Sequence, residues 1–391
     1  MRPTIYLALT DDWELRGDGS GDIDKIQFQP MRELTRLYNK YGVRGTFYAE
    51  MMQQLAFRKH QARYPELKTL ADRWDAHVID AFKQGHDIQL HLHTRWSDAR
   101  FENGAWHVSG DWSILNYDPD AARAMLAAGK EYLESLLRQV NQGYKCVAFR
   151  AGALSIAPSA HILNLLVSLG IELDTSIVGG LRVESRDLQF DYTNCEEDFL
   201  AFFPRMDDAR RVSDKPEKIV CIPIHHFRGS RRQVFKQTLS FSWRRAMLHV
   251  KRARLKTYSS PPEDHTSKEW EQVGRTSNLA LVYDKAIKPC IYGKHLTSDF
   301  SRLNHSFMRE MLRDIRRRAA ATGLRELPVV LTNHSKYITD YLPIELFIRE
   351  AAAADDIKFI TLTELAGKFQ RGEFHVRTGS GSDRVDVHYT Q

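Results

Sequence analysis

Short apolar segments alternate with amphipathic ones along most of the chain, and this alternation limits the folds open to it. The first segment, residues 4–11, contains Ile5-Tyr6-Leu7-Ala8-Leu9, which is apolar on both faces, as a buried parallel strand is. Further strands are predicted at residues 44–49, 86–93, 145–149, 171–177, 219–224, 328–332 and 358–361. Helices are predicted between them at residues 30–41, 67–84, 119–140, 158–169, 300–321, 343–354 and 363–370. A series of βα units predicts a parallel sheet, either closed as a barrel or doubly wound.

Composition excludes several classes of protein. The chain has 391 residues, of which 42% are hydrophobic and 27% charged, as in ordinary soluble proteins. No apolar run approaches the ~20 residues that a membrane span needs, and Met1-Arg2-Pro3 leads directly into the first strand without a signal-peptide pattern. The cysteines, Cys146, Cys195, Cys221 and Cys290, are widely spaced, which disfavours a disulfide framework or a thiolate metal site. We therefore expect free thiols and a cytoplasmic protein.

The net charge of +6 belongs to one segment. Residues 225–262 hold ten Lys and Arg residues and no Asp or Glu, and without these ten the chain has 46 basic and 50 acidic residues. Aromatic and aliphatic side chains such as Phe241, Trp243 and Leu248 lie among the arginines. The segment predicts a peripheral contact with anionic lipid at the inner membrane or with an acidic glycan, and a solvated loop is the alternative. No nucleic-acid partner is expected, because no recognised binding fold accompanies the segment.

Residues 85–93 read Gly-His-Asp-Ile-Gln-Leu-His-Leu-His, and polar and apolar side chains alternate from Asp87 to His93. Because a strand sends successive side chains to opposite faces, one face carries a polar row: Asp87, Gln89, His91 and His93. Two imidazoles at this spacing can both reach a single metal ion. Two hydrogen-bonded histidines at a strand edge are the alternative, and this segment alone does not decide between them.

Polar side chains also follow other predicted strands, at the ends where α/β barrels keep their chemistry. These side chains are Asp11 and Asp12 after the first strand, His91 and His93 on the central one, Arg150 after the strand at 145, and His334 after the strand at 328. Each has a structural alternative: a turn, an ion pair or a buried, hydrogen-bonded histidine. Their occurrence at the same end of separate strands favours a shared site.

This set resembles the polysaccharide deacetylase superfamily, the NodB-homology or carbohydrate esterase family 4 type. The family's Thr-Phe-Asp-Asp motif corresponds to Leu9-Thr10-Asp11-Asp12, and its Gly-His-Glu-Ile-Gly-Asn-His motif to Gly85–His91. Phe149-Arg150-Ala151-Gly152 matches the third motif, and Leu331-Thr332-Asn333-His334 resembles the late Leu-x-His motif. The resemblance covers residues 4–180 and 325–370. It implies a distorted (β/α)7-type barrel.

The resemblance also implies a ligand set for a divalent metal, with zinc expected from two imidazoles and one carboxylate. The ligands would be Asp12, His91 and His93. In the family the second histidine follows the first by four residues, where this chain has Arg95, and the Gln-Leu-His-Leu-His form resembles a distant branch of the superfamily. We expect His93 to replace it, because the strand period aims His93 the same way as His91.

The remaining roles follow from residue type and the family's chemistry. Asp11 would take the proton of the attacking water, Arg150 would orient Asp11 and hold it ionised, and His334 would protonate the departing amine or steady the oxyanion. Trp96 and His226 are expected to contact substrate, although His226 is equally compatible with an ordinary loop position. For Asp11 and Asp12 to share one site, the chain must turn at the end of the first strand.

We therefore predict a barrel domain over residues 1–370, with an insertion at about 225–300 and a flexible tail at 371–391. The expected activity is metal-dependent removal of an acyl group, in the first place N-acetyl, from an amino sugar of a surface polysaccharide or glycolipid. Two alternatives stay open. One is an inactive carbohydrate-binding relative, which Arg95 favours, and the other is a hydrolase of small linear or cyclic amides.

Overall fold

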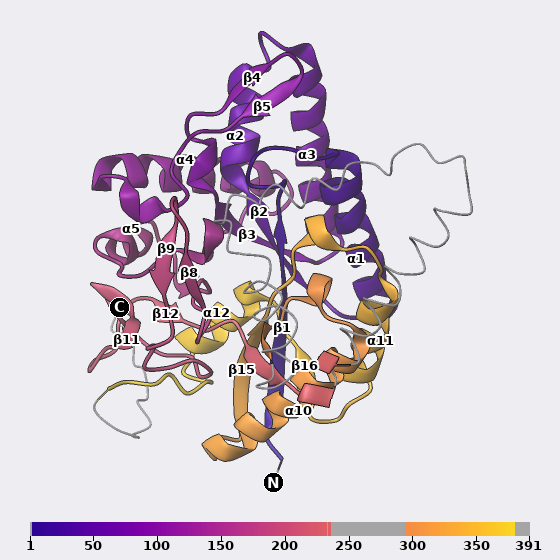
Figure 1. Ribbon diagram of the computed structural model, residues 1–391, viewed down its shortest axis with the longest axis vertical. Helices are drawn as coiled ribbons and strands as arrows, with labels where there is room; N and C mark the ends of the chain where they lie inside the picture. The colour runs from indigo at the N-terminus through magenta and orange to yellow at the C-terminus, as the bar shows by residue number, and fades with distance from the viewer. Residues whose placement is uncertain (1, 233, 236–293, 380–391) are drawn as a thin grey trace.

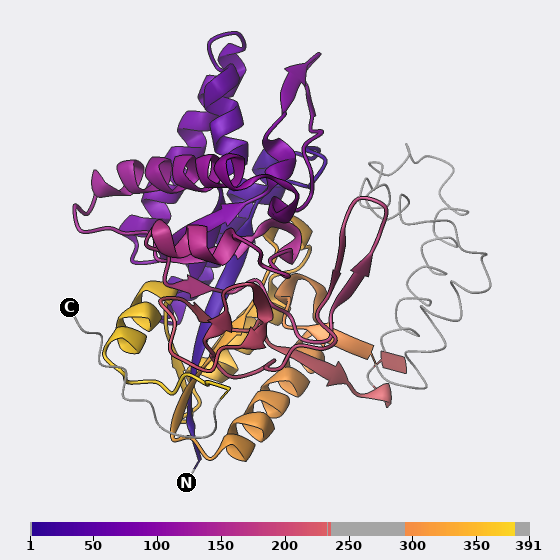
Figure 2. The same ribbon diagram turned by 90° about the vertical axis from the view of Figure 1, so that its left-hand side faces the viewer.

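A central parallel sheet organises the molecule. The computed structural model describes residues 2–232, 234–235 and 294–379, and within these residues the main sheet has eight strands in the order β12-β7-β6-β3-β2-β1-β15, with β16 beside β1. The strands are β1 (Thr4–Trp13), β2 (Thr46–Glu50), β3 (Asp87–Leu92), β6 (Ala148–Ala151), β7 (Leu173–Asp174), β12 (Val220–Cys221), β15 (Glu326–Leu331) and β16 (Ile357–Phe359). All pairings in this sheet are parallel. β1 runs from the N-terminus at the bottom of Figures 1 and 2 towards the top.

The sheet curls until its two edges meet. Ile224, just after β12, forms a parallel bridge with Val330 of β15, and the His225 amide donates to the Val330 carbonyl at 2.9 Å. This contact joins the first and last strands of the sheet order. The structure therefore confirms the predicted distorted (β/α)7-type barrel and excludes an open, doubly wound sheet.

Helices cover the outside of the sheet (Figure 1). They are α1 (Gln29–Lys40), α2 (Met51–His60), α3 (Pro65–Lys83), α4 (Pro119–Arg138), α5 (Ile162–Ser168), α10 (His305–Thr322), α11 (Leu342–Ala352) and α12 (Leu362–Gln370). Local signals set several starts: Asp118 accepts from the Ala121 amide before α4, and Thr361 and Glu364 form a capping box on α12. No helix in the described ranges is long and apolar enough to cross a membrane.

The two faces of β1 belong to two different hydrophobic clusters. Leu7 and Leu9 pack with helix residues such as Leu34 of α1, whereas Ala8 packs with Tyr48 and Val330 of neighbouring strands. Successive side chains of a strand point to opposite faces, so one set fills the layer under the helices and the other fills the barrel interior. Both faces are buried, which is why this strand reads as a continuous apolar run.

Antiparallel hairpins decorate the barrel. They are β4–β5 (Arg100–Glu102 and Ala105–His107), β8–β9 (Arg182–Glu184 and Gln189–Asp191), β10–β11 (Pro204–Arg205 and Asp208–Val212) and β13–β14 (His226–Gly229 and Lys294–Thr297). β13 and β14 stand at the base of the predicted insertion. Most of that insertion, including residues 236–262 of the basic segment, lies outside the described residues.

The C-terminal boundary needs correction. The predicted flexible tail begins at residue 371, yet Phe374 and Val376 are buried and the Arg377 amide donates to the Ala201 carbonyl at 2.9 Å. Packing of these apolar side chains extends the ordered barrel to at least Gly379, and the rest of the tail lies outside the described residues. The prediction relied on the Gly-Ser pattern that follows and did not consider Phe374 and Val376, two apolar residues at alternate positions.

Candidate active site

Four buried side chains converge at the C-terminal end of the sheet: Glu14, Glu50, His91 and His93. The ligating atoms that they offer all lie within 4.8 Å of one another. Neighbouring strands supply them, because β2 ends at Glu50, which is paired with His91 of β3, and Glu14 directly follows β1. Two of the four, Glu14 and Glu50, were missed by the sequence prediction. The two-residue period that placed His93 beside His91 also places Glu14 beside Asp12 and could have found it.

The two histidines aim nitrogen atoms at one carboxylate oxygen. His91 Nε2 lies 3.4 Å from Glu14 Oε2, and His93 Nε2 contacts the same oxygen. His91 Nδ1 donates to the Arg150 carbonyl at 2.9 Å, which fixes the ring and turns Nε2 towards the cluster. His91 Nε2 is buried without a well-aligned hydrogen bond. A buried nitrogen of this kind, beside a second imidazole and a carboxylate, fits a divalent metal such as zinc.

Charge accumulates in this cluster. Burial alone would raise the pKa of Glu14, but His93 and Lys336 outweigh burial and hold the pKa of that carboxyl well below its usual range. Burial would lower the pKa of His91, but Asp12 and Glu14 raise it to about 9. The site therefore carries an ionised carboxylate and an imidazole that must release a proton before it can bind a cation.

Glu50 is tied to the backbone. Its Oε1 accepts from the Met52 amide at 2.9 Å and the Gln53 amide at 3.4 Å, which caps α2, and its Oε2 accepts from the His93 amide at 2.8 Å. Burial raises the pKa of Glu50. These bonds hold the end of β3 against the start of α2. Glu14, His91 and His93 are therefore the three side chains best placed as ligands, with Glu50 holding His93 in position.

Asp12, the predicted carboxylate ligand, lies in a salt bridge. Arg150 Nη1 is 2.5 Å from Asp12 Oδ1, and Arg150 also donates to the Thr175 carbonyl at 3.1 Å and lies over the Tyr48 ring. Both charged side chains are buried. The prediction paired Arg150 with Asp11, and the structure pairs it with Asp12 instead. Asp12 is not a member of the cluster of converging ligand atoms within the described residues.

Asp11 lies on the opposite face of β1. The strand continues straight to Trp13 and stays paired with β2 as far as Ala49, so the turn that would bring Asp11 and Asp12 together is absent. Asn333 donates to Asp11 Oδ1, and Asp11 is paired with Phe47 of β2, which belongs to the hydrophobic cluster on the helix side of the sheet. Burial and the neighbouring Asp12 raise the pKa of Asp11 well above its usual range. Because successive side chains of a strand point to opposite faces, the two carboxylates do not share one site, contrary to the prediction.

His334 lies on the Asp12 side. Its Nε2 is 3.5 Å from Asp12 Oδ2, and its Nδ1 is 2.9 Å from Asp299 Oδ2. His334 is partly exposed, whereas Asp299 is buried. Asp299 was not predicted, because it follows the insertion and only the folded chain brings it to His334. The four side chains form a continuous series from Asp299 through His334 and Asp12 to Arg150.

The two residues predicted to contact substrate lie elsewhere. Trp96 is buried in an aromatic cluster against Phe57 and Trp106, a packing role. His226 lies on β13 with its Nε2 2.9 Å from Asp198 Oδ2 and its Nδ1 2.6 Å from His295 Nε2. Among the described interactions His226 has no contact with the metal-ligand candidates, and Trp96 meets them only through its backbone amide, which donates to the His93 carbonyl at 3.1 Å.

Arg95 does not enter the site. Its guanidinium donates to the Val108 carbonyl at 3.0 Å and the Gly110 carbonyl at 3.2 Å, and it lies over the Trp112 ring. The side chain holds the loop that follows β3. The position occupied by a histidine in the family is therefore used for loop packing here, and His93 takes the place beside His91.

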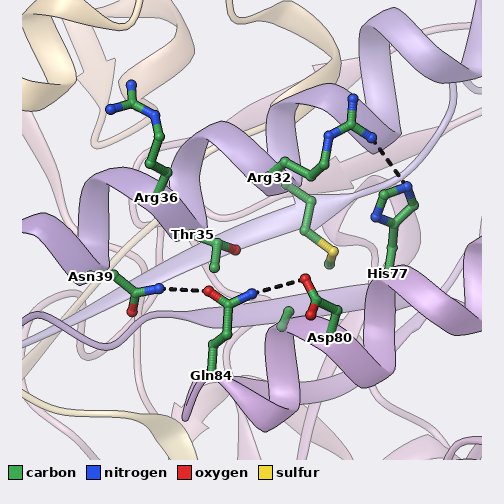
Figure 3. Close-up of a pocket in the computed structure, with 9 residues that line it drawn as sticks. Arg32, Thr35, Arg36, Asn39, His77, Asp80 and Gln84 are labelled. Carbon is green, nitrogen blue, oxygen red and sulfur yellow. Dashed lines mark hydrogen bonds between the residues drawn. The ribbon is translucent and has the colours of Figure 1, made fainter.

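An open groove of about 310 Å³ lies on the outside of the barrel between α1 and α3 (Figure 3). Its polar side chains mostly satisfy one another: Arg32 Nη1 is 3.3 Å from His77 Nε2, and Asn39 donates to Gln84, which donates to Asp80. None of the predicted site residues lines this groove. The groove is therefore separate from the polar side chains at the strand ends.

Comparison with solved structures identifies the fold. A protein from Mycobacterium smegmatis described as a polysaccharide deacetylase superposes with a TM-score of 0.50 at 15% sequence identity, covering 98% of this chain and 96% of its own. The chain has a polysaccharide deacetylase fold. A polysaccharide deacetylase from Pseudomonas aeruginosa PAO1 matches with a TM-score of 0.43 at 13% identity over 94% of this chain and 91% of that one. The PuuE allantoinase matches with a TM-score of 0.40 at 11% identity over 94% and 90%.

No family model matches the sequence, and no curated protein matches it either. At 15% identity the deacetylase fold is shared while most side chains differ. The functional conclusion therefore depends on the strand-end residues themselves.

Proposed function

We propose that this protein is a metal-dependent hydrolase that removes an acyl group, in the first place N-acetyl, from an amino sugar of a surface polysaccharide or glycolipid. The observation that carries the proposal is the convergence of His91 Nε2, His93 Nε2 and Glu14 Oε2 at the strand ends of a deacetylase fold. A divalent ion held by these atoms would polarise the amide carbonyl of the substrate. This ligand set replaces the predicted one by substituting Glu14 for Asp12.

Asp12 and His334 are assigned the proton transfers. Asp12 Oδ2, the oxygen that Arg150 does not contact, would accept a proton from the attacking water while the water oxygen bonds to the acyl carbon. His334 would deliver a proton from Nε2 to the amine nitrogen as the carbon–nitrogen bond breaks. The products are a carboxylic acid and a free amino sugar. Asp299 would hold the Nδ1–H of His334 and so keep Nε2 directed at the reaction.

Metal content and acetate release test this function together. We expect the purified protein to bind about one zinc or similar ion per chain, and to release acetate from N-acetylated amino sugars only while that ion is present. Chelation followed by zinc addition should remove and then restore activity. Full activity in exhaustively chelated protein would reject the metal role, and metal-loaded protein inactive on every acylated amine would reject the hydrolase.

Asp11 and Asp12 provide a matched pair for the proton acceptor. Asp12→Asn should retain the metal and lower turnover by ~10²–10⁴, the usual cost of losing a general base. Asp11→Asn makes the same change on the opposite face of β1 and should retain most turnover. Turnover of each variant is measured beside its metal content. A large loss in Asp11→Asn with an active Asp12→Asn would return the base to Asp11.

Burial of the site favours a second substrate class. His91 and Asp12 are only 1% and 2% exposed, and a deeply set site admits a small linear or cyclic amide more readily than a polymer. The same assay with small amides beside N-acetylated sugar oligomers decides between the classes. Turnover of small amides alone would replace the sugar assignment and leave the metal chemistry in place.

A further inference from the structure

Lys336 lies beside the proposed metal ligands and has no role in the mechanism above. It belongs to the short 3-10 helix η7 (Ser335–Tyr337) that follows β15, and its side chain is only 7% exposed. Its Nζ lies 3.0 Å from Glu14 Oε1 and 5.1 Å from the centre of the Tyr337 ring. A buried ammonium is costly unless it is paired, and one partner of Lys336 is the proposed metal ligand itself.

The two oxygens of Glu14 have separate partners. Oε1 faces Lys336, whereas Oε2 faces His91 and His93. An ion at the histidines would therefore meet one oxygen of a carboxylate whose other oxygen already binds a cation. The arrangement leaves Glu14 available as a one-oxygen ligand without displacing Lys336.

We infer that Lys336 is the resident counter-ion of Glu14: it orients the carboxylate in the metal-free protein, and it weakens the hold of the site on a divalent cation. The inference builds on the proposed function, since it concerns the affinity of the same metal site. Two positive charges a few ångströms apart in a buried site repel each other strongly, because the interior screens charge less than water does. Lys336 therefore favours a site that is preassembled and exchanges its metal, over one that retains the metal permanently.

The chain offers a matched control for this lysine. Lys358 likewise lies over a tyrosine ring, 5.3 Å from the centre of Tyr6, and its Nζ is 3.4 Å from the Tyr6 hydroxyl. It is on β16, beside the opposite end of β1. Replacing Lys358 removes a lysine–tyrosine contact of the same kind without touching Glu14.

The test is a zinc titration of the full-length protein in competition with a chromophoric chelator. Lys336→Met and Lys336→Gln should bind Zn²⁺ at least ~10-fold more tightly than the wild type, because the repulsion is removed. Lys336→Arg, which keeps the charge, and Lys358→Met should stay close to the wild-type affinity. Circular dichroism confirms that each titrated variant is folded, and the Gln variant, which still donates to Glu14, serves if the Met variant does not fold.

Unchanged or weaker zinc binding in the neutral Lys336 variants would overturn the counter-ion inference and leave the proposed function standing. If neither the wild type nor any Lys336 variant binds zinc, the metal site itself is wrong, and both proposals fall. Zinc binding by the neutral variants alone would support the inference in its strongest form.

Discussion

Two buried ion pairs stand side by side at the strand ends, Arg150–Asp12 and Lys336–Glu14, and they differ in how the cation holds its carboxylate. Arg150 uses its planar guanidinium on Asp12, Thr175 and the face of Tyr48 together. Lys336 is a point charge on one oxygen of Glu14 and leaves the other oxygen to the two histidines. Arginine's fixed fork holds several partners at once, whereas an ammonium acts on its partner as a single point charge. The arginine pair builds the barrel mouth, and the lysine pair prepares a cation site.

The largest effect should come from removing the shared carboxylate. Glu14→Gln keeps the size of the side chain but removes its charge, so metal content should fall to background and turnover should be lost with it. Metal analysis and acetate release measure the two effects on one preparation. Glu33→Gln, a change at an exposed helical ion pair, is the control. Retention of bound metal in Glu14→Gln would place the ligand carboxylate elsewhere.

Breaking the arginine pair should cost stability. Arg150→Met leaves Asp12 as a buried charge without its partner, and the free energy of unfolding should fall by about 3–5 kcal/mol. Arg150→Lys should not restore it, because an ammonium cannot reproduce the contacts with Thr175 and Tyr48. Denaturant unfolding measures the change, with Arg36→Met on the surface as control. A loss below ~1 kcal/mol would show that the Arg150–Asp12 pair contributes no more stability than an exposed ion pair does.

Asp174 is another buried carboxylate, has no ion pair within residues 2–232, 234–235 and 294–379, and should respond to pH. Burial raises the pKa of Asp174 to about 6, although Ser176 donates to it through its hydroxyl and amide. Because the folded-state pKa lies above the unfolded value, its contribution to stability is full below about pH 4 and is lost as pH rises through about 6. Asp174→Asn should therefore gain stability relative to the wild type, by up to about 3 kcal/mol between pH 4 and pH 7. The same difference in the free energy of unfolding between Asp174→Asn and the wild type at pH 4 and at pH 7 would contradict this prediction.

The smallest effect concerns orientation. Asp299→Asn retains a hydrogen-bond acceptor for His334 Nδ1 but loses the charge, so we expect turnover to fall by about 10-fold to 100-fold with metal content unchanged, in keeping with the outer partners of catalytic groups. Restored turnover in Asp299→Glu would separate positioning from folding. An Asp299→Asn variant with the wild-type rate would remove Asp299 from the site.

The sequence predicted the barrel because strand and helix periods are local properties, readable over a few residues. α2 was missed, because its apolar residues do not line one face and most of its side chains are buried. The same local logic placed His91 and His93 together. It failed at Asp11, where two adjacent aspartates resembled a turn although the strand continues to Trp13.

Other parts of the site depend on contacts between distant segments. Asp299 reaches His334 only after a long insertion, and Lys336 follows β15, which is paired with β1 although the two strands are far apart in the sequence. Such pairings carry no local period, so the sequence could name the strand ends but could not assign the partners. Arg150 illustrates the limit: its place at the strand end was predicted, while the choice between Asp11 and Asp12 required the fold.

The closure of the barrel through Ile224 and Val330 has a consequence for how such a protein can change over generations. The seam consists of a short bridge instead of a long ladder, and the predicted insertion begins immediately after it. Lengthening a surface connection costs little conformational entropy, since each doubling of loop length adds only about 0.6 kcal/mol. Additions at the seam also leave β1, β2 and β3, with their ligands, in register. The seam is therefore the place where new recognition elements can be gained or lost while the reaction centre is inherited intact.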